Sequence, residues 1–170
     1  MPVSKLLRRV LVFCVSDPDP PTRQTVLESL DARFDPFLCE PHCTSLLGQA
    51  LQDEELLVRK AVIQIMGRLT RHNPAYVIPT LRKMLIQILA ELEYSVELRQ
   101  KEEAAEMLSA LCLHAPNLIE PYAGAVLSCL LKKLKEANVD GSPKLVANLL
   151  EAIGELSEVS GREMKSHLSE

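Results

Sequence analysis

Residues 39–43 (CEPHC) are the one segment of this chain whose residue types and spacing resemble a metal site. Zinc in proteins takes four tetrahedral nitrogen or sulfur ligands, and Cys39, His42 and Cys43 supply three at most. The other histidines stand singly at positions 72, 114 and 167, without a second Cys/His pair. We therefore interpret the segment as a loop with incidental thiols, and we expect neither a metal nor a cofactor.

Catalytic motifs are absent from the sequence. It has no Gly-x-Ser-x-Gly nucleophile elbow, no glycine-rich phosphate-binding motif and no kinase catalytic loop. The acidic pairs Glu54–Glu55 and Glu102–Glu103 could suggest general acid–base chemistry. We expect both pairs in the first turn of a helix instead, where acids interact favourably with the helix dipole. No catalytic residue is assigned, and an enzyme that uses the thiols and imidazole of residues 39–43 is kept only as a minor alternative.

The charge balance argues against a nucleic-acid binder. The 170 residues include 19 Lys and Arg against 23 Asp and Glu, a net charge of −4, whereas nucleic-acid binding usually needs a basic excess. No run of apolar residues is long enough to span a membrane. The N-terminal residues fit a first helix better than an export signal, and five cysteines, an odd number, suggest reduced thiols in a cytosolic or nuclear protein. Three basic spots are interpreted as solvated helix faces, with an acidic partner as the minority interpretation: Lys5/Arg8/Arg9, Arg82/Lys83 and Lys132/Lys133/Lys135.

The elements that carry these residues are predicted to be helices. The chain is rich in Leu, has no Trp and only 6 Gly, which favours an all-α fold over a turn-rich β fold. Asn73 before Pro74 and Ser142 before Pro143 are typical helix starts. Apolar residues recur at helical spacing, most clearly at positions 81, 84, 85, 88 and 92. The breaks between such stripes predict about eight helices.

The predicted helices repeat along the chain. Residues 59–79 align without gaps on residues 101–121, at an offset of 42, so that Pro74 falls on Pro116. Such a period is that of HEAT or armadillo repeats, in which helix pairs stack into an α-solenoid. We predict a single solenoid segment over 1–170, of about four helical hairpins. Its units are about 4–34, 42–71, 74–114 and 117–160, and 161–170 begins a further, truncated unit.

Two packing details follow from the repeats. Asp17 and Arg23 are separated by six residues, as are Asp53 and Arg59. An acid in the turn and a base early in the second helix, such as Asp53 and Arg59, can tie adjacent turns together as a ladder. Tyr76 and Tyr122 follow prolines of successive units, and we expect them to pack between repeats.

Three segments carry a more specific resemblance. Residues 73–93 (NPAYVIPTLRKMLIQILAELE), residues 15–20 with 30–35 (VSDPDP and LDARFD), and residues 153–156 with 159–164 (IGEL and VSGREM) resemble, in order and spacing, the HEAT-repeat region of the target of rapamycin kinases. The resemblance covers about residues 10–165. It departs at residues 135–141 (KEANVDG), where the family pattern has an Asp-Pro-rich loop, so no partner contact is carried over to that loop.

The resemblance implies a segment of very large serine/threonine kinases that regulate growth in response to nutrients. Their N-terminal solenoid scaffolds the complex and engages Raptor-type or Rictor-type subunits, and the kinase domain lies far downstream, so no catalytic residue is carried over. Self-association, a cytoplasmic location and contact with lysosomal or vacuolar and other endomembranes are further expectations. We therefore predict a non-catalytic scaffold and protein-interaction segment, without nucleic acid. The alternative is a standalone HEAT/armadillo adaptor that binds a peptide or protein in its concave groove.

Overall fold

The computed structural model describes residues 3–140 and 142–160, apart from the side chains of residues 138–140. These residues form helices and no strand, so the predicted all-α class is confirmed. The chain divides into two compact units, Met1–Leu81 and Arg82–Glu170. The division into four repeat units stays a prediction, and the expected further unit at 161–170 lies outside the described residues.

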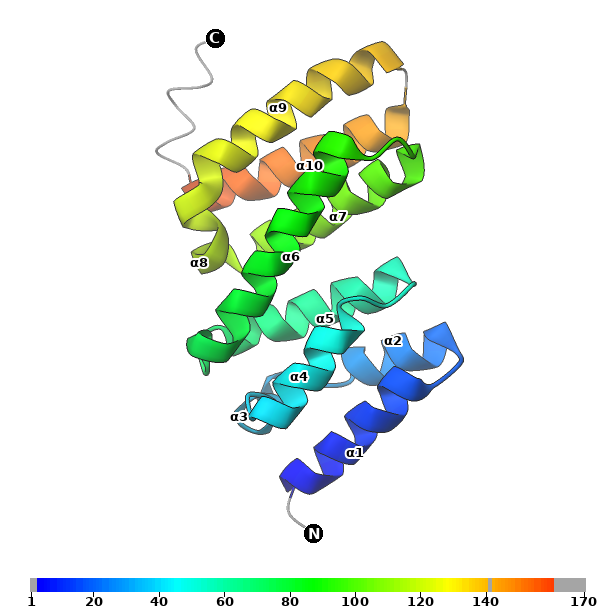
Figure 1. Cartoon of the computed structure of the whole chain (residues 1–170). Coiled ribbons are helices and arrows are strands. Elements are labelled where there is room, and N and C mark those ends of the chain that lie inside the picture. The colour runs from blue at the N-terminus through cyan, green and yellow to red at the C-terminus, as the bar shows by residue number, and fades with distance from the viewer. Residues whose placement is uncertain (1–2, 141, 161–170) are drawn as a thin grey trace. The chain divides into compact units, whose positions relative to one another are not determined.

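The first unit is built from two helical hairpins. Helix α1 (Val3–Ser16) turns into α2 (Pro20–Glu28), and α4 (Pro41–Ala50) turns into α5 (Leu56–Leu69). Helix α1 packs against α4 and α2 against α5, so like helices of the two hairpins are neighbours (Figure 1). This stacking of hairpins is that of the predicted α-solenoid.

A short helical segment connects these hairpins. It consists of a 3₁₀ turn, η1 (Ala32–Phe34), followed by α3 (Asp35–Leu38), where the sequence suggested only a break. Local hydrogen bonds explain both this turn and the start of α2. Asp31 accepts from the Arg33 amide at 2.9 Å, and Asp19 caps α2 by accepting from the Thr22 amide at 3.0 Å. Asn, Asp, Ser and Thr side chains at such positions satisfy amides that have no partner within the helix.

The core of the first unit is aliphatic. Its largest fully buried side chains come from every helix of the two hairpins and from α3, with almost no aromatic contribution. They include Leu11, Leu27, Leu38, Leu47, Met66 and Leu69. Neighbouring helices are therefore held together by layers of medium-sized side chains, each of which contributes about 1.5–3 kcal/mol by leaving water.

Helix α6 (Pro74–Tyr94) begins in the first unit and ends in the second. Its buried stripe includes Leu85, Ile88 and Leu92, as the helical spacing predicts. Tyr76 is 57% exposed, so the expectation that it packs between repeats is wrong. Tyr76 lies beside Val77, one residue away from the buried stripe, and an offset of one residue turns a helical side chain by about 100°.

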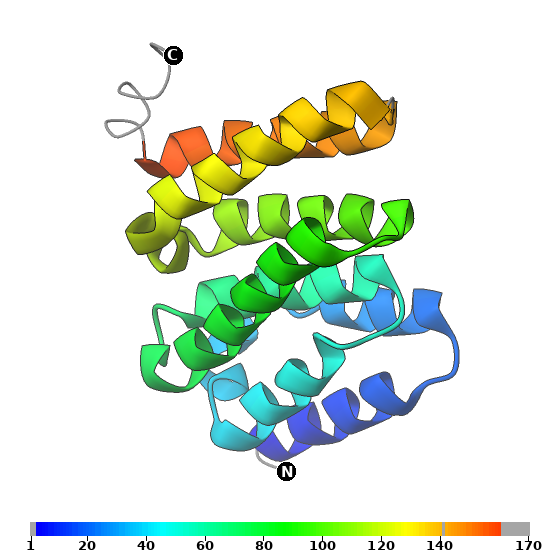
Figure 2. The same cartoon turned by 45° about the horizontal axis from the view of Figure 1, so that its top comes forward.

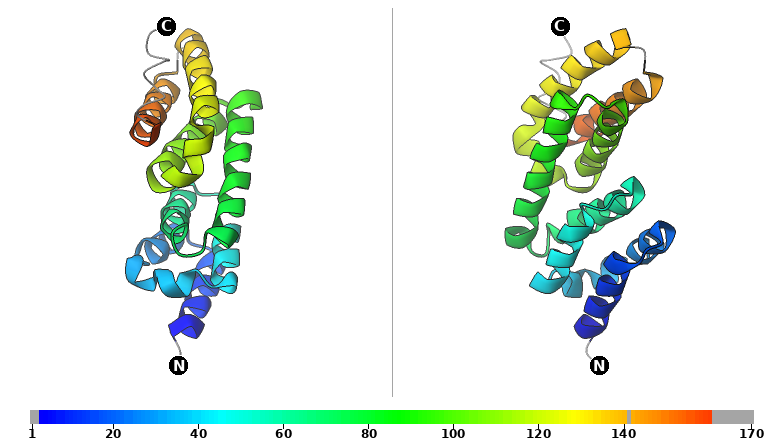
Figure 3. Two further views of the ribbon diagram at one scale, coloured as in Figure 1. Left: turned by 90° about the vertical axis from the view of Figure 1, so that its left-hand side faces the viewer. Right: turned by 45° about the vertical axis from the view of Figure 1, so that its right-hand side comes forward.

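The second unit contains α7 (Leu98–His114), α8 (Pro116–Ile119), η2 (Glu120–Tyr122), α9 (Ala123–Asp140) and α10 (Pro143–Ser160). Helix α10 packs against both α7 and α9, as Figures 2 and 3 show. Ser142 caps α10, because its hydroxyl accepts from the Leu145 amide at 3.3 Å. The first half of the predicted unit 117–160, for which the hairpin pattern predicts one helix, is divided into α8, η2 and α9, with Pro121 inside the 3₁₀ turn.

Candidate functional site

Residues 39–43 lie at the junction of α3 and α4. Cys39 follows α3, and its Sγ donates to the Pro36 carbonyl at 3.2 Å. His42 is exposed, whereas Cys43 is buried in α4. Within residues 3–140 and 142–160, no three His, Cys, Asp or Glu side chains are grouped so that they could hold a metal ion. The structure therefore places the two thiols in different surroundings.

Burial governs the chemistry of the thiols. Burial raises the pKa of Cys43 above its ordinary value, and a smaller effect of Arg8 opposes this rise. Burial also raises the pKa of Cys112 to about 12. Because the thiolate is the nucleophilic form of cysteine, these two groups are suited to packing and not to attack on a substrate.

A buried ion pair fixes the junction next to this segment. Asp35 opens α3 with its side chain 3% exposed, and both of its oxygens accept from Arg68 of α5 at 3.1–3.3 Å. The Arg68 guanidinium also donates to the Leu30 carbonyl at 2.7 Å. In the same region, Asn73 donates to the Cys39 carbonyl at 2.9 Å. Side chains at the C-terminal end of α5 and just beyond it therefore donate hydrogen bonds to the backbone carbonyls on either side of α3 and to its first carboxylate.

Sequence reasoning missed the Asp35–Arg68 pair. The two residues are 33 positions apart, and no second pair at that spacing marks them as a repeated feature. The signal that was available is the Asp-Pro step at positions 35–36, which is typical of a helix start. It would have predicted α3, although not the partner of its first residue.

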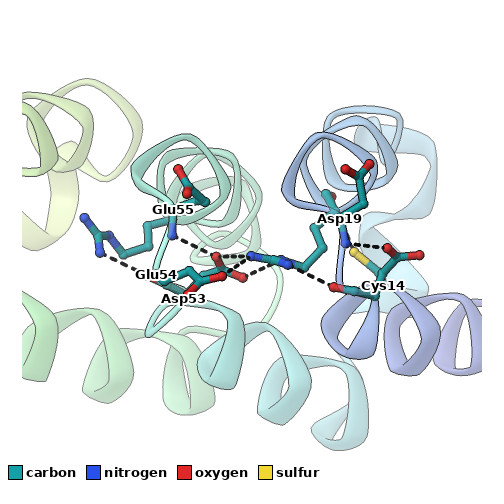
Figure 4. Close-up of polar contacts among 8 residues, drawn as sticks. Cys14, Asp19, Asp53, Glu54 and Glu55 are labelled. Atoms are coloured by element: carbon teal, nitrogen blue, oxygen red, sulfur yellow. Dashed lines mark hydrogen bonds and ion pairs between the residues drawn. The ribbon is translucent and has the colours of Figure 1, made fainter.

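A second ion pair joins the two hairpins of the first unit, and Figure 4 shows it between α2 and the turn before α5. Arg23 donates from Nε and Nη2 to the two carboxylate oxygens of Asp53, both at 2.8 Å. Its Nη1 donates to the Asp17 carbonyl at 2.9 Å. A bidentate pair of this kind fixes direction as well as distance. We call the Arg23–Asp53 pair the rung.

The predicted ladder is therefore present with a different pairing. Arg59 donates to the backbone carbonyl of Asp53 at 3.0 Å, just as Arg23 does to that of Asp17. The carboxylate of Asp53 is held by Arg23 of the preceding hairpin. The expected tie between Asp53 and Arg59 is thus a turn contact within one hairpin, and the tie between hairpins comes from Arg23.

The rung changes the pKa of both partners. Burial would raise the pKa of Asp53, but the Arg23 hydrogen bonds and the Glu55 amide outweigh it, and the net pKa lies below its ordinary value. The hydrogen bonds that Arg23 donates to Asp53 raise the pKa of Arg23. Both groups are therefore charged at neutral pH, and each stabilises the charge of the other.

The acidic pairs lie slightly away from their predicted places. Glu54 and Glu55 precede α5, which begins at Leu56, and Glu102 and Glu103 lie in the second turn of α7. Glu102 accepts from the Ser142 hydroxyl at 3.2 Å and also faces Lys144 at 3.5 Å. The backbone carbonyl of Glu102 accepts from Asn148 at 3.1 Å, and the Glu106 carboxylate accepts from the same amide at 3.2 Å. Glu102 and Glu106 therefore connect α7 to α10 and to its capping residue.

One of the three basic spots is paired with acids rather than simply solvated. Lys133 of α9 is 8% exposed at its side chain and contacts Glu93 at 3.2 Å and Glu136 at 2.8 Å. Lys132 also pairs with Glu93. Their hydrogen bonds, with that of Lys132 the larger effect, lower the pKa of Glu93. This cluster joins the end of α6 to α9 within the second unit.

The basic spot on α1 differs from the paired cluster on α9. Lys5, Arg8 and Arg9 are exposed, and none of them makes a hydrogen bond or ion pair with any residue in the described part of the chain. Together with Val12 and Phe13 they line a shallow hollow along α1. This is the candidate binding surface that the geometry offers, and we call it the α1 face.

Several curated proteins have sequences similar to that of this chain. The chain is 41% identical over 162 residues, 95% of its length, to "Serine/threonine-protein kinase tor1" of Schizosaccharomyces pombe. It is 37% identical over 168 residues, 99% of its length, to "Serine/threonine-protein kinase TOR2" of Saccharomyces cerevisiae. It is 38% identical over 159 residues, 94% of its length, to "Serine/threonine-protein kinase mTor" of Drosophila melanogaster. Over nearly its whole length, the chain is therefore similar to one segment of target of rapamycin kinases.

The match covers little of those kinases. The chain spans 7%, 7% and 6% of the length of these three curated relatives. No family model matches the chain. None of the helices in the described part of the chain has the length and apolar character that crossing a bilayer requires.

Proposed function

We propose that this chain is a non-catalytic HEAT-repeat scaffold segment of the target of rapamycin type, which acts by presenting helix faces to protein subunits. The observation that carries the proposal is the 37–41% identity to three such kinases over 94–99% of this chain. The resemblance implies Raptor-type or Rictor-type subunits as partners, self-association in the assembled complex, and work in the cytoplasm or at its endomembranes.

The polar contacts support a scaffold better than an enzyme. Within each unit, carboxylates are paired with side chains of neighbouring elements, as in the rung and in the Glu106–Asn148 contact. Buried thiols have raised pKa values. Groups arranged in this way fix the angle and spacing of neighbouring helices, which is the property a solenoid needs in order to hold its partners in place.

Affinity capture tests the proposal. The tagged full chain is immobilised and mixed separately with a purified Raptor-type and a purified Rictor-type subunit, and we expect at least one to be retained. In parallel, the chain is incubated with radiolabelled ATP, magnesium and a generic protein substrate, and we expect no phosphate transfer. Retention of neither subunit, or phosphate transfer by the purified chain, contradicts the proposal.

A variant separates scaffolding from chemistry at residues 39–43. The double substitution Cys39→Ala/His42→Ala removes the accessible thiol and imidazole of this segment and leaves the buried Cys43 in place. Capture of the subunit is expected to be unchanged. A loss of capture with an unchanged circular dichroism spectrum would assign a direct role to this segment.

A further inference from the structure

Helix α1 has two faces with different surroundings. Leu7, Leu11 and Cys14 are buried, and the helix packs against α2, α3 and α4. On the other side, Phe13 is 69% exposed and Leu6 is 51% exposed. The interior of the first unit therefore uses only part of the apolar surface of α1.

The residues of the α1 face form one stripe. Lys5, Arg8, Arg9, Val12 and Phe13 follow the spacing i, i+3, i+4, i+7 and i+8, which brings them to one side of a helix. At 1.5 Å per residue the stripe is about 12 Å long, or two helical turns. Cations occupy its first part and apolar side chains its second.

The stripe has no internal charge compensation. Residues 3–16 contain three cations and no acid, although the whole chain carries a net charge of −4. Arg23, Arg68 and Lys133, by contrast, are each paired with a carboxylate within their own unit. Three adjacent cations without a partner create a local positive field that attracts an anionic group.

We propose that the α1 face binds an acidic, amphipathic helical segment of a partner protein. This inference rests on the proposed interaction function and names the chemistry of one of its binding surfaces. Carboxylates of the partner segment lie against Lys5, Arg8 and Arg9, and an apolar side chain one to two turns along it lies against Val12 and Phe13. Contacts of this type, with apolar anchors and charges of matching sign, specify a helix in a groove.

Other anionic partners fit the stripe less well. A helix that lies in a membrane interface needs a free apolar face opposite its cations, whereas the most apolar side of α1, with Leu7 and Leu11, is already buried. Nucleic-acid binding depends on many phosphate contacts, and three cations with one aromatic residue in a net acidic chain provide few. A charged half followed by an apolar half over two turns matches the length and side-chain spacing of a polypeptide helix.

A defined peptide tests the inference. The probe is a fluorescein-labelled, Ala-based helical peptide with Glu at i, i+3 and i+4 and Leu at i+7 and i+8, and fluorescence anisotropy measures its binding to the full chain. A second peptide with the same charges carries Ser in place of both Leu. We expect the Leu peptide to bind more tightly than the Ser peptide, and its affinity to fall as salt is added, because salt screens exposed charges.

Matched substitutions locate the site. Arg8→Glu/Arg9→Glu is expected to weaken binding of the Leu peptide at least about tenfold, while Arg82→Glu/Lys83→Glu makes the same charge change at an exposed pair on α6 and is expected to leave it unchanged. Phe13→Ser should weaken binding, and Ile86→Ser, at a residue 63% exposed on α6, should not. Thermal melts confirm that each variant is folded.

The outcomes separate this inference from the proposed function. Equal weakening by both charge-reversal pairs, or no binding of the Leu peptide, overturns the assignment of the α1 face. Binding to phosphatidylserine vesicles that Arg8→Glu/Arg9→Glu abolishes, without binding of the peptide, would show a lipid surface and also overturns it. If subunit capture persists while the peptide does not bind, the scaffold proposal stands and only the α1 face is rejected.

Discussion

The link between α2 and α5 in the first unit and the link between α7 and α10 in the second unit use different polar chemistry. In the first unit, a guanidinium on α2 reaches a carboxylate in the turn before α5, so that the rung joins two ionic groups with their side chains 7% and 11% exposed. In the second unit, Ser142, which caps α10, and Asn148 of α10 donate from neutral side chains to α7, beside the exposed Lys144 that faces Glu102 at 3.5 Å. The first connection runs from helix to turn, and the second runs from helix to helix.

The difference follows from the residue that lies three positions before α5 in the first unit and before α7 in the second. Asp53 lies three residues before the first residue of α5, and Ser95 lies three residues before that of α7. The second unit thus has a hydroxyl at the position where the first unit has a carboxylate. Ser95 bonds locally, to Gln100 at 2.7 Å. The residue at this position decides which bond forms there: Asp53 bonds to Arg23 of the preceding hairpin, and Ser95 bonds within its own unit.

The largest effect is expected at the buried ion pair of the first unit. Asp35→Asn removes a carboxylate whose side chain is 3% exposed and leaves the Arg68 guanidinium, which is 27% exposed, without its counter-charge. Removing the buried partner of an ion pair leaves the other charge unpaired, and we expect the free energy of unfolding to fall by about 3 kcal/mol. Urea denaturation measures this loss.

Asp31→Asn is the matched control for that change. It alters a carboxylate that pairs with Arg33 at the surface, where the two side chains are 46% and 84% exposed. Exposed pairs contribute below about 1 kcal/mol. If Asp31→Asn costs as much as Asp35→Asn, burial is not what distinguishes the two pairs.

The rung is expected to give the next largest effect, with a pH dependence. Asp53→Asn removes a carboxylate with both oxygens bonded to Arg23, and the free energy of unfolding at neutral pH should fall by about 2 kcal/mol. The pKa of Asp53 is lower in the folded chain than its ordinary value of 3.8. Its stabilisation is therefore complete above about pH 5 and is lost as the pH falls below 3.8 through the folded pKa.

Acid denaturation checks the sign of this effect. The difference in unfolding free energy between the original chain and Asp53→Asn should shrink as the pH is lowered from 5 towards 2. A difference that stays constant over this range would show that Asp53 acts through its shape and not through its charge.

The sequence predicted the helices better than their contacts. Periodicity predicted the buried stripe of α6, including Leu85 and Leu92, because one side of a helix must leave water whatever it packs against. The six-residue spacing identified Asp53 as a ladder residue but paired it with Arg59. A repeat shows which residues hold like positions in their own hairpins, and it does not show which long side chain of a neighbouring hairpin reaches them.

For the same reason, the predicted solvent exposure of the basic residues is confirmed on α1 and wrong for Lys133 on α9. The cations of α1 were correctly expected on a solvated face, since no acid lies within one or two turns of them. The same expectation failed for Lys133, because Glu93 reaches it from a helix 40 residues earlier. Tertiary partners at such separations leave no trace in local spacing.

A smaller effect is expected from the neutral contact of the second unit. Asn148→Ala removes the amide that donates to the Glu102 carbonyl and the Glu106 carboxylate. A buried hydrogen bond between neutral partners is worth about 1 kcal/mol, and the loss should be near this value. Because neither the amide nor the carbonyl titrates, the loss should vary less with pH between 5 and 3 than the loss in Asp53→Asn. A larger loss at acid pH would mean that the Glu106 carboxylate is the more important partner.

The smallest effect is expected when the second unit is given the acid of the first. Ser95→Asp places a carboxylate at the position that Asp53 holds before α5, close to the positive end of the α7 dipole. The dipole term alone is about 0.3–1 kcal/mol and falls off beyond the first turn, and the Ser95–Gln100 hydrogen bond of the original chain is lost or exchanged. We expect a net gain of at most about 0.5 kcal/mol, measured by urea denaturation. A gain near the 2 kcal/mol of the rung would contradict this and would show that the new carboxylate finds a strong partner. A net loss would show that the Ser95–Gln100 hydrogen bond outweighs the dipole term.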